Sequence, residues 1–486
     1  MPSRDPIPDS GQGQDLSSAV TQRIDSLTSW RARFWVPLIM GLIMLGDSWD
    51  GIVIAYVGPA FRQTWNLDIE ALGTVISLGY AGQFLGAIAL GSASEKFGRM
   101  PVFLWSILVM CLLSLGCAFT PDKTLFFALR FFEGFALGGA LPASISYVNE
   151  LAPTATRGRY FAVFQFIMVA GYTLAAMTAT YIVPAFGWRA MFVIGAFPAL
   201  LLPLVKLTLP ESPRWLMRQG RAADANRALS QLGAFPVDLS LPMAPEPAKT
   251  PISTLFGPEY RGRFAVVATL WFFTSLVAFA FSNWAPTLYT QAYHTSLKDA
   301  LWYVTIASAA YFFVPLLLAS ILDVLGRKGP AIFCAAVALA SLIGLMVIDG
   351  KQIWLVATLI STGWVTIATA VMILWPYTAE IFPTRVRATG LGLASSLARA
   401  ASTLTPVVVA WVLSATGSPR DVFAILAGGT AIVLVTWIFF TRETARKSLE
   451  ETSAATPSLA LADGADPGPL QAATTPPSSE TIAPVT

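Results

Sequence analysis

Long apolar runs alternate with short polar segments along most of the chain. A helix needs about 20 mostly apolar residues to cross the hydrocarbon core of a bilayer, and each run approaches or exceeds that length. The pattern therefore predicts an all-α membrane protein with twelve transmembrane helices. We expect these spans at 34–57, 71–92, 101–119, 124–148, 160–183, 188–209, 264–289, 299–322, 329–348, 352–378, 388–413 and 420–441.

Lysine and arginine are distributed unevenly over the polar segments. An even number of spans puts both termini on one side, and most basic residues lie in segments on that side. The opposite segments hold only Arg62, Lys123, Arg189, Lys298, Lys351 and Arg420. By the positive-inside rule, both termini are predicted to be cytoplasmic. The first 30 residues lack the short apolar core of a signal peptide, so we expect the first span to direct insertion.

The long polar segment in the middle divides the chain into two groups of six spans. We expect a cytoplasmic N-terminal tail at 1–33, a six-helix bundle at 34–209 and a second six-helix bundle at 264–441. Between them, 210–263 begins with charges and apolar residues at helical spacing, which predicts cytoplasmic helices beneath the bundles. The tail 442–486 is rich in Ala, Pro, Ser and Thr, which is typical of disorder.

The two halves repeat each other. GSASEKFGR (91–99) corresponds to ASILDVLGRK (319–328), and ELAPTATR (150–157) corresponds to EIFPTRVR (380–387). The offsets agree, at 228 for Glu95 and Asp323 and at 230 for Glu150 and Glu380. A parallel repeat of two helix bundles, with the substrate near mid-membrane between them, is a recurrent carrier architecture.

These motifs resemble the major facilitator superfamily over nearly the whole chain, which implies two pseudo-symmetric six-helix bundles. The first copy of the signature loop comprises Gly91, Glu95, Lys96, Gly98 and Arg99; the second comprises Asp323, Gly326, Arg327 and Lys328. The chain departs from the family pattern in three places. Glu95 replaces the usual Asp, and Met100 and Val324 stand where further bases are common.

Three further motifs resemble the branch shared by sugar porters and bacterial organic-acid:proton symporters. They are RFFEGFALGGALP (130–142), PESPRWL (210–216) and EIFPTRVRATG (380–390). The WAPTLY ending of span seven and the pair Asp47-Ser48-Trp49-Asp50 are closer to aromatic-acid:proton symporters, although the usual Gly after the first acid is missing. This resemblance implies proton-coupled transport of an aromatic acid.

The first span carries two acids, Asp47 and Asp50. Each ionised carboxylate at mid-bilayer costs about 2.5–3.5 kcal/mol on insertion scales. Their spacing of three residues places both on one side of a helix. They require a partner, a water-filled cavity or a proton, which indicates a carrier. The alternative is that they cap a local break at Gly46 or Gly51.

Helix rise predicts two charged pairs at matching depths. Asp50 in span one and Arg130 in span four both lie roughly 10 Å below the outer surface, and Asp47 and Glu133 lie one turn deeper. An Asp50–Arg130 pair would keep Asp50 ionised, whereas an Asp47–Glu133 pair would favour a proton on one acid. We therefore assign proton coupling to these four residues. Alternatively, Arg130 and Glu133 form a structural ion pair within span four.

Arg399 lies roughly 16 Å into span eleven, near the bilayer centre. No acid of the second half lies at that depth, so a bidentate grip on a substrate carboxylate is the favoured hypothesis. Pairing with Asp47 across the bundle interface is the alternative. The substrate-binding set also includes possible aromatic walls and polar contacts, namely Gln165, Trp271, Asn283, Trp284, Trp375 and Tyr377, with Tyr289 and Trp364 as further candidates.

The resemblance also implies a cytoplasmic gate. If Glu95 faces the start of span eleven and Asp323 that of span five, the two signature loops latch the halves together. The gate set comprises Gly91, Glu95, Gly98, Arg99, Glu150, Arg157, Asp323, Gly326, Arg327, Glu380 and Arg387.

Together these features predict a monomeric secondary transporter in a bacterial cytoplasmic membrane. It would import a small, aromatic carboxylate with protons, without a metal or other cofactor. The net charge of +3 is dispersed, so nucleic acid is not expected as a partner, and no catalytic motif indicates an enzyme. The alternatives are a proton-coupled sugar or polyol porter, a drug or metabolite exporter, and a non-transporting sensor.

Overall fold

A computed structural model describes residues 15–27, 34–238, 240–242, 251–348 and 350–444. Most of the predicted N-terminal tail and nearly all of the predicted disordered tail lie outside these residues. The described chain is helical, and it confirms the all-α membrane fold: twelve of its helices are long and apolar enough to cross a bilayer.

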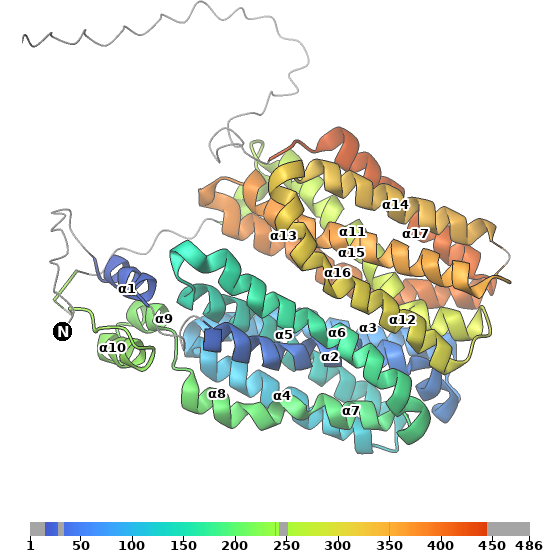
Figure 1. The fold of residues 1–486 in the computed structure, drawn as a ribbon, viewed down its shortest axis with the longest axis horizontal. Coiled ribbons are helices and arrows are strands. Elements are labelled where there is room, and N and C mark those ends of the chain that lie inside the picture. The colour runs from blue at the N-terminus through green and yellow to red at the C-terminus, as the bar shows by residue number, and fades with distance from the viewer. Residues whose placement is uncertain (1–14, 28–33, 239, 243–250, 349, 445–486) are drawn as a thin grey trace, which may run out of the picture.

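The transmembrane helices form two groups (Figure 1). The N-terminal half contains α2 (Val36–Trp65), α3 (Ile69–Phe97), α4 (Arg99–Phe119), α5 (Lys123–Leu151), α6 (Arg157–Phe186) and a sixth span made of α7 (Arg189–Gly195), η3 (Phe197–Leu201) and α8 (Leu202–Thr208). The C-terminal half contains α11 (Arg261–Gln291), α12 (Leu297–Phe312) continued by α13 (Val314–Leu325), α14 (Lys328–Val347), α15 (Ile353–Ile381), α16 (Thr384–Thr416) and α17 (Pro419–Val435) with η5 (Thr436–Phe440). The sixth span changes helix type, and the eighth is interrupted between two α-helical segments, in each case where a proline opens the new segment.

Short helices cover one end of the N-terminal half, which we call the linker face; the opposite end is the far face (Figure 1). They are α1 (Leu16–Asp25), α9 (Pro213–Arg218) and α10 (Ala222–Gln231). The segment 210–263 was expected to contain helices, but α1 was not expected within the polar tail. The apolar side of α1 is buried against α9, and its end is fixed because Thr154 N–H donates to Asp25 Oδ1 at 2.6 Å.

Glycines let α3 and α5 approach so closely that their backbones touch. A Cβ at Gly134 would lie 2.0 Å from Gly79 O, and one at Gly82 would lie 2.0 Å from Phe131 O. Small residues at helix interfaces serve this purpose in membranes, where packing replaces the hydrophobic effect between helices. The contact positions Arg130 and Glu133, which lie on the same stretch of α5.

Among the described residues, the buried core is shared between the halves toward the far face. One apolar cluster there combines Val53 and Tyr56 of α2 with Phe281 and Trp284 of α11. Toward the linker face each half has its own cluster, and the ribbons diverge (Figure 1).

Direct contacts also close the far face. Gly73 of α3 packs against Pro406 and Ala410 of α16. The Thr180 and Thr305 hydroxyls lie 3.2 Å apart across the α6–α12 contact. The structure is therefore closed at the far face.

Candidate functional site

A buried charge cluster lies inside the N-terminal half. Arg130 Nη1 lies 3.5 Å from Asp50 Oδ2 and 2.5 Å from Glu133 Oε2, and both acids are 0% exposed. The structure thus forms the predicted Asp50–Arg130 pair together with the Arg130–Glu133 pair that was its alternative. It does not form the predicted Asp47–Glu133 pair, because Glu133 follows Arg130 by three residues and turns to the same guanidinium.

Residues of α4 and α7 complete this cluster. Ser114 Oγ donates to Asp50 Oδ1 at 3.3 Å, and Cys117 Sγ lies 3.7 Å from Glu133 Oε2. The Phe192 ring lies 5.6 Å from Arg130 Cζ and supplies a cation–π contact. The sequence does not predict these contacts, because a small polar residue in an apolar span carries no signal of which helix it faces.

The second charged site joins the two halves. Asp47 on α2 is 8% exposed, and one of its carboxylate oxygens is buried without a hydrogen bond. The Arg399 guanidinium on α16 is within electrostatic range of that carboxylate. Neither side chain makes a direct ion pair with another residue in the described part of the chain. Opposite charges from different halves thus lie near each other without forming an ion pair.

Further polar and aromatic groups lie near the interface between the halves. Tyr80 O–H of α3 donates to Asn283 Oδ1 of α11 at 3.1 Å, which links the halves. The Tyr311 and Trp364 rings pack with centroids 5.2 Å apart. Gln165 Oε1 and Trp284 Nε1 are buried without hydrogen-bond partners. Unpaired buried polar atoms of this kind are typical of sites that receive a ligand or water.

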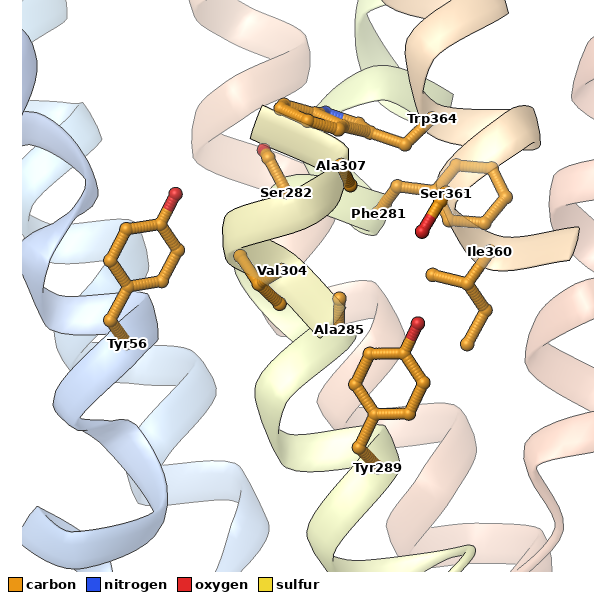
Figure 2. A pocket seen from close by; sticks show the side chains of 10 residues that line it. All are labelled: Tyr56, Phe281, Ser282, Ala285, Tyr289, Val304, Ala307, Ile360, Ser361 and Trp364. Carbon is orange, nitrogen blue, oxygen red and sulfur yellow. The ribbon is translucent and has the colours of Figure 1, made fainter. Parts of the chain in front are cut away.

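A cavity with about 300 Å³ of empty volume lies toward the far face (Figure 2). Its wall combines Tyr56 of α2 with residues of the C-terminal half: Phe281, Ser282, Ala285, Tyr289, Val304, Ala307, Ile360, Ser361 and Trp364. Tyr289 and Trp364, two of the aromatic candidates, line it. Most of the wall is apolar, with hydroxyl groups from Tyr56, Ser282, Tyr289 and Ser361.

Three predicted substrate contacts have partners within the C-terminal half, and their part in substrate binding stays a prediction. Trp271 Nε1 donates to Thr378 Oγ1 at 2.9 Å, and its ring packs edge-on against Trp375 at 5.0 Å. Tyr377 packs against Trp437 at 4.8 Å. Hydropathy alone predicts that these residues lie in a span, and it does not predict which side of the helix faces the interface.

At the linker face, the signature loops form matching ion pairs within each half. Arg99 Nη2 lies 3.3 Å from Glu150 Oε1, and Arg327 Nη2 lies 2.8 Å from Glu380 Oε1. Arg218 of α9 also binds Glu150, at 2.8 Å.

A second pair of acids holds the loop backbones. Glu211 accepts hydrogen bonds from the backbone N–H groups of Arg99 and Met100, and Glu443 does the same for Arg327 and Lys328. Gly98 precedes Arg99 and Gly326 precedes Arg327, with φ of +111° and +80°. A side chain at Gly98 would collide with Glu211, and one at Gly326 would collide with Glu443. Burial raises the pKa of Glu211. Neither acid was assigned a role from sequence, although their offset of 232 nearly matches the repeat.

The remaining gate residues are less defined. The Glu95 backbone oxygen accepts from Trp215 Nε1 at 2.8 Å, and Arg387 Nε donates to Phe382 O at 3.4 Å. Arg157 is exposed, and Gly91 borders open space. The Asp323 side chain lies outside the described residues. The latch between the halves therefore stays a prediction.

No group of acids, cysteines and histidine suited to a metal occurs among the described residues.

Comparison with known proteins identifies the family of this chain. A family model described as sugar (and other) transporter matches residues 53–455. The chain belongs to this transporter family of the major facilitator superfamily. It is therefore a membrane transporter and not an enzyme.

Its relatives include transporters of aromatic acids. The chain is 28% identical to the niacin transporter NiaP of Acinetobacter baylyi over 444 residues, covering 89% of this chain and 99% of that protein. It is 24% identical to the benzoate transport protein of the same organism, covering 81% and 86%. The solved structure of the partially occluded, inward-open xylose transporter XylE of E. coli matches with a TM-score of 0.69 at 22% identity, covering 85% and 99%. That match shows the fold.

The Tyr80–Asn283 bond predicts a specific effect on closure of the far face. Tyr80→Phe removes a buried hydrogen bond between the halves, worth about 0.5–1.5 kcal/mol, so the population open at the far face should rise about 2–12-fold. The measurement is the rate at which a cysteine at Ala285, in the cavity wall, reacts with an impermeant thiol reagent added at the far face. Tyr181→Phe is the matched control, since Tyr181 is exposed. Equal rates for both variants would contradict this role.

Proposed function

We propose that this protein imports a small aromatic carboxylate together with protons, by alternating access between its two halves. The proposal rests on Asp47 and Arg399, two opposite charges that lie near each other without forming an ion pair. An arginine buried in a membrane normally finds a carboxylate. Here the nearest one belongs to the other half and is not in contact, which suits a site for a carboxylate supplied by the substrate.

The same opposition supports coupling to protons. An ionised Asp47 competes with a substrate anion for Arg399, because both are negative and lie near one guanidinium. A proton on Asp47 removes that competition, so proton and anion bind together. A guanidinium presents its donors in a planar fork that matches a carboxylate, which favours an organic acid over a neutral solute.

Aromatic side chains at this level favour a ring-bearing acid. Tyr80, Tyr311 and Trp364 lie around the interface, and offset or edge-on contacts between rings stabilise binding. Niacin and benzoate, named for the relatives, are both ring carboxylates. We therefore extend that substrate class to this chain.

Orientation and gating follow from the charges. The linker face carries most of the basic residues, so we place it and both termini in the cytoplasm of a bacterium. The signature-loop pairs Arg99–Glu150 and Arg327–Glu380 would then form part of the cytoplasmic gate. Closing this side would bring Glu95 and Asp323 to the opposite half.

A sugar or polyol porter is the second candidate, because hydroxyl groups line the far-face cavity and solved structures of similar fold include a xylose transporter. Competition in reconstituted vesicles separates the two. Benzoate, 4-hydroxybenzoate and niacin should inhibit uptake of a labelled aromatic acid, whereas xylose and glucose should not. Inhibition by the sugars alone would favour the porter.

Substitution of Arg399 tests the anion site. Arg399→Ala removes hydrogen bonds to a charged group worth about 1.5–3 kcal/mol, so affinity for the acid should fall about 10–150-fold. The measurement is the inhibition constant of each acid in the competition assay. Arg420→Ala, at an exposed arginine of α17, should bind as the unchanged protein does. Unaltered affinity in Arg399→Ala would rule out the proposed anion site.

Substitution of Asp47 tests coupling. Asp47→Asn leaves Arg399 available at every pH, so exchange of labelled for unlabelled substrate should continue. Accumulation should lose the contribution of one proton, which is about tenfold in the equilibrium ratio for a pH gradient of one unit. The measurement is the plateau of substrate uptake in vesicles with an imposed pH gradient. A plateau equal to that of the unchanged protein would exclude Asp47 as a proton carrier.

A further inference from the structure

We infer that the far-face cavity binds a neutral phenol at a site separate from the proposed anion site, and that a phenol bound there holds the far face closed. Such an inhibitory site goes beyond the proposed function, and its test requires no transport. The size of the cavity, its lining and its place between the two halves support the inference.

The cavity matches one substituted ring in size and polarity. Its empty volume of about 300 Å³ is at the lower end of the range of ligand pockets, roughly 300–1,000 Å³. None of the described residues that line it is charged. An ionised carboxylate would lose its hydration there without gaining a cation, which is costly. A phenol stays neutral at pH 7 because its pKa is about 10, as for tyrosine. The cavity therefore favours a phenol over an ionised aromatic acid.

Hydroxyl groups stand on two sides of the otherwise apolar wall (Figure 2). The Tyr289 hydroxyl of α11 lies beside Ser361 of α15. Tyr56 of α2 supplies another hydroxyl from the opposite half. A phenol hydroxyl both donates and accepts, so it can pair with either side. Phe281 and Trp364 supply aromatic surfaces for the ring.

The cavity and the proposed anion site lie at different depths. Tyr56, in the cavity wall, follows Asp47 by nine residues on the continuous helix α2, which is about 13 Å along the helix axis. Asp47 is the acid within electrostatic range of Arg399. Because α15 runs from the far face to the linker face, Trp364 bounds the cavity on the side of the linker face. A phenol in the cavity therefore leaves the anion site free.

The cavity as formed depends on closure of the far face. Tyr56 belongs to the N-terminal half and the rest of the wall to the C-terminal half. Two residues beyond Tyr56, a Cβ at Gly58 would lie 3.7 Å from Thr287 Oγ1 of α11. On α12, which supplies another part of the wall, Ser308 O accepts from Thr173 Oγ1 of α6 at 2.9 Å. Parting of the halves at these contacts takes Tyr56 away from the cavity. A ligand that fills the cavity thus binds the closed far face more tightly and increases its population.

The experiment measures how fast a far-face contact opens, with 4-methylphenol as the probe. In a protein without other cysteines, Thr305→Cys places a thiol in the contact between α6 and α12, outside the cavity wall. Its reaction with an impermeant thiol reagent added at the far face reports opening. At ten times its dissociation constant, measured by equilibrium dialysis, 4-methylphenol should slow this reaction about tenfold.

Variants made in the same Thr305→Cys protein identify the site. Ala285→Leu fills the cavity and should abolish the effect of 4-methylphenol. Tyr289→Phe removes a hydroxyl partner, so the concentration that halves the rate should rise about 2–12-fold. Tyr181→Phe, at an exposed tyrosine of α6, is the matched control and should respond as the parent does. Arg399→Ala, which removes the proposed anion site, should also respond as the parent does.

Four results would overturn the inference. No slowing in the parent would show that a phenol does not hold the far face closed. Equal slowing in the parent, Ala285→Leu and Tyr289→Phe would show that the phenol acts through the bilayer and not through the cavity. Loss of the effect in Arg399→Ala would place the phenol at the anion site. A faster reaction in the parent would show that the phenol favours the open far face.

Discussion

An ionised side chain inside the hydrocarbon core of a bilayer needs an opposite charge or a hydrogen-bond partner. The ionisable side chains buried in the spans of this protein do not all have one. Asp47, Asp50, Glu133, Arg130 and Arg399 all lie within membrane-spanning helices. Only Asp50, Glu133 and Arg130 are in direct contact, and that cluster has more acids than bases. The remaining charge must be balanced by groups that bind reversibly, and a proton and a substrate carboxylate are the simplest candidates.

The arrangement of the halves determines when that balance can change. Far-face contacts between α3 and α16 and between α6 and α12 close one end, while each half keeps a separate core near the linker face. Asp47 and Arg399 belong to different halves, so their separation must depend on the conformation. Glu211 and Glu443 accept matching backbone hydrogen bonds, so both signature loops are held in the same way in their own halves.

The sequence predicts those features that depend on length, depth or repetition. The twelve spans follow from run length, and the matching signature loops from a near-constant offset. The Asp50–Arg130 contact follows from equal depth on helices one and four. Depth does not fix the direction of a side chain around its helix, which is why the expected Asp47–Glu133 pair is absent. For the same reason depth does not decide whether Trp271, Trp375 and Tyr377, which have partners within the C-terminal half, also face the interface. The helix α1 is too short and polar to stand out within its segment, whereas the repeat offset would have identified Glu211 and Glu443.

The most direct test asks whether Arg399 faces water. In a protein without other cysteines, Arg399→Cys should react with a charged, impermeant thiol reagent added at the linker face, and the substrate acid should slow the reaction. Leu404→Cys, at an exposed apolar residue elsewhere on α16, should react at least about tenfold more slowly, because a thiolate forms poorly in lipid. If Arg399→Cys is as unreactive as Leu404→Cys, position 399 does not line a water-filled chamber, and the account of this protein as an anion carrier is wrong.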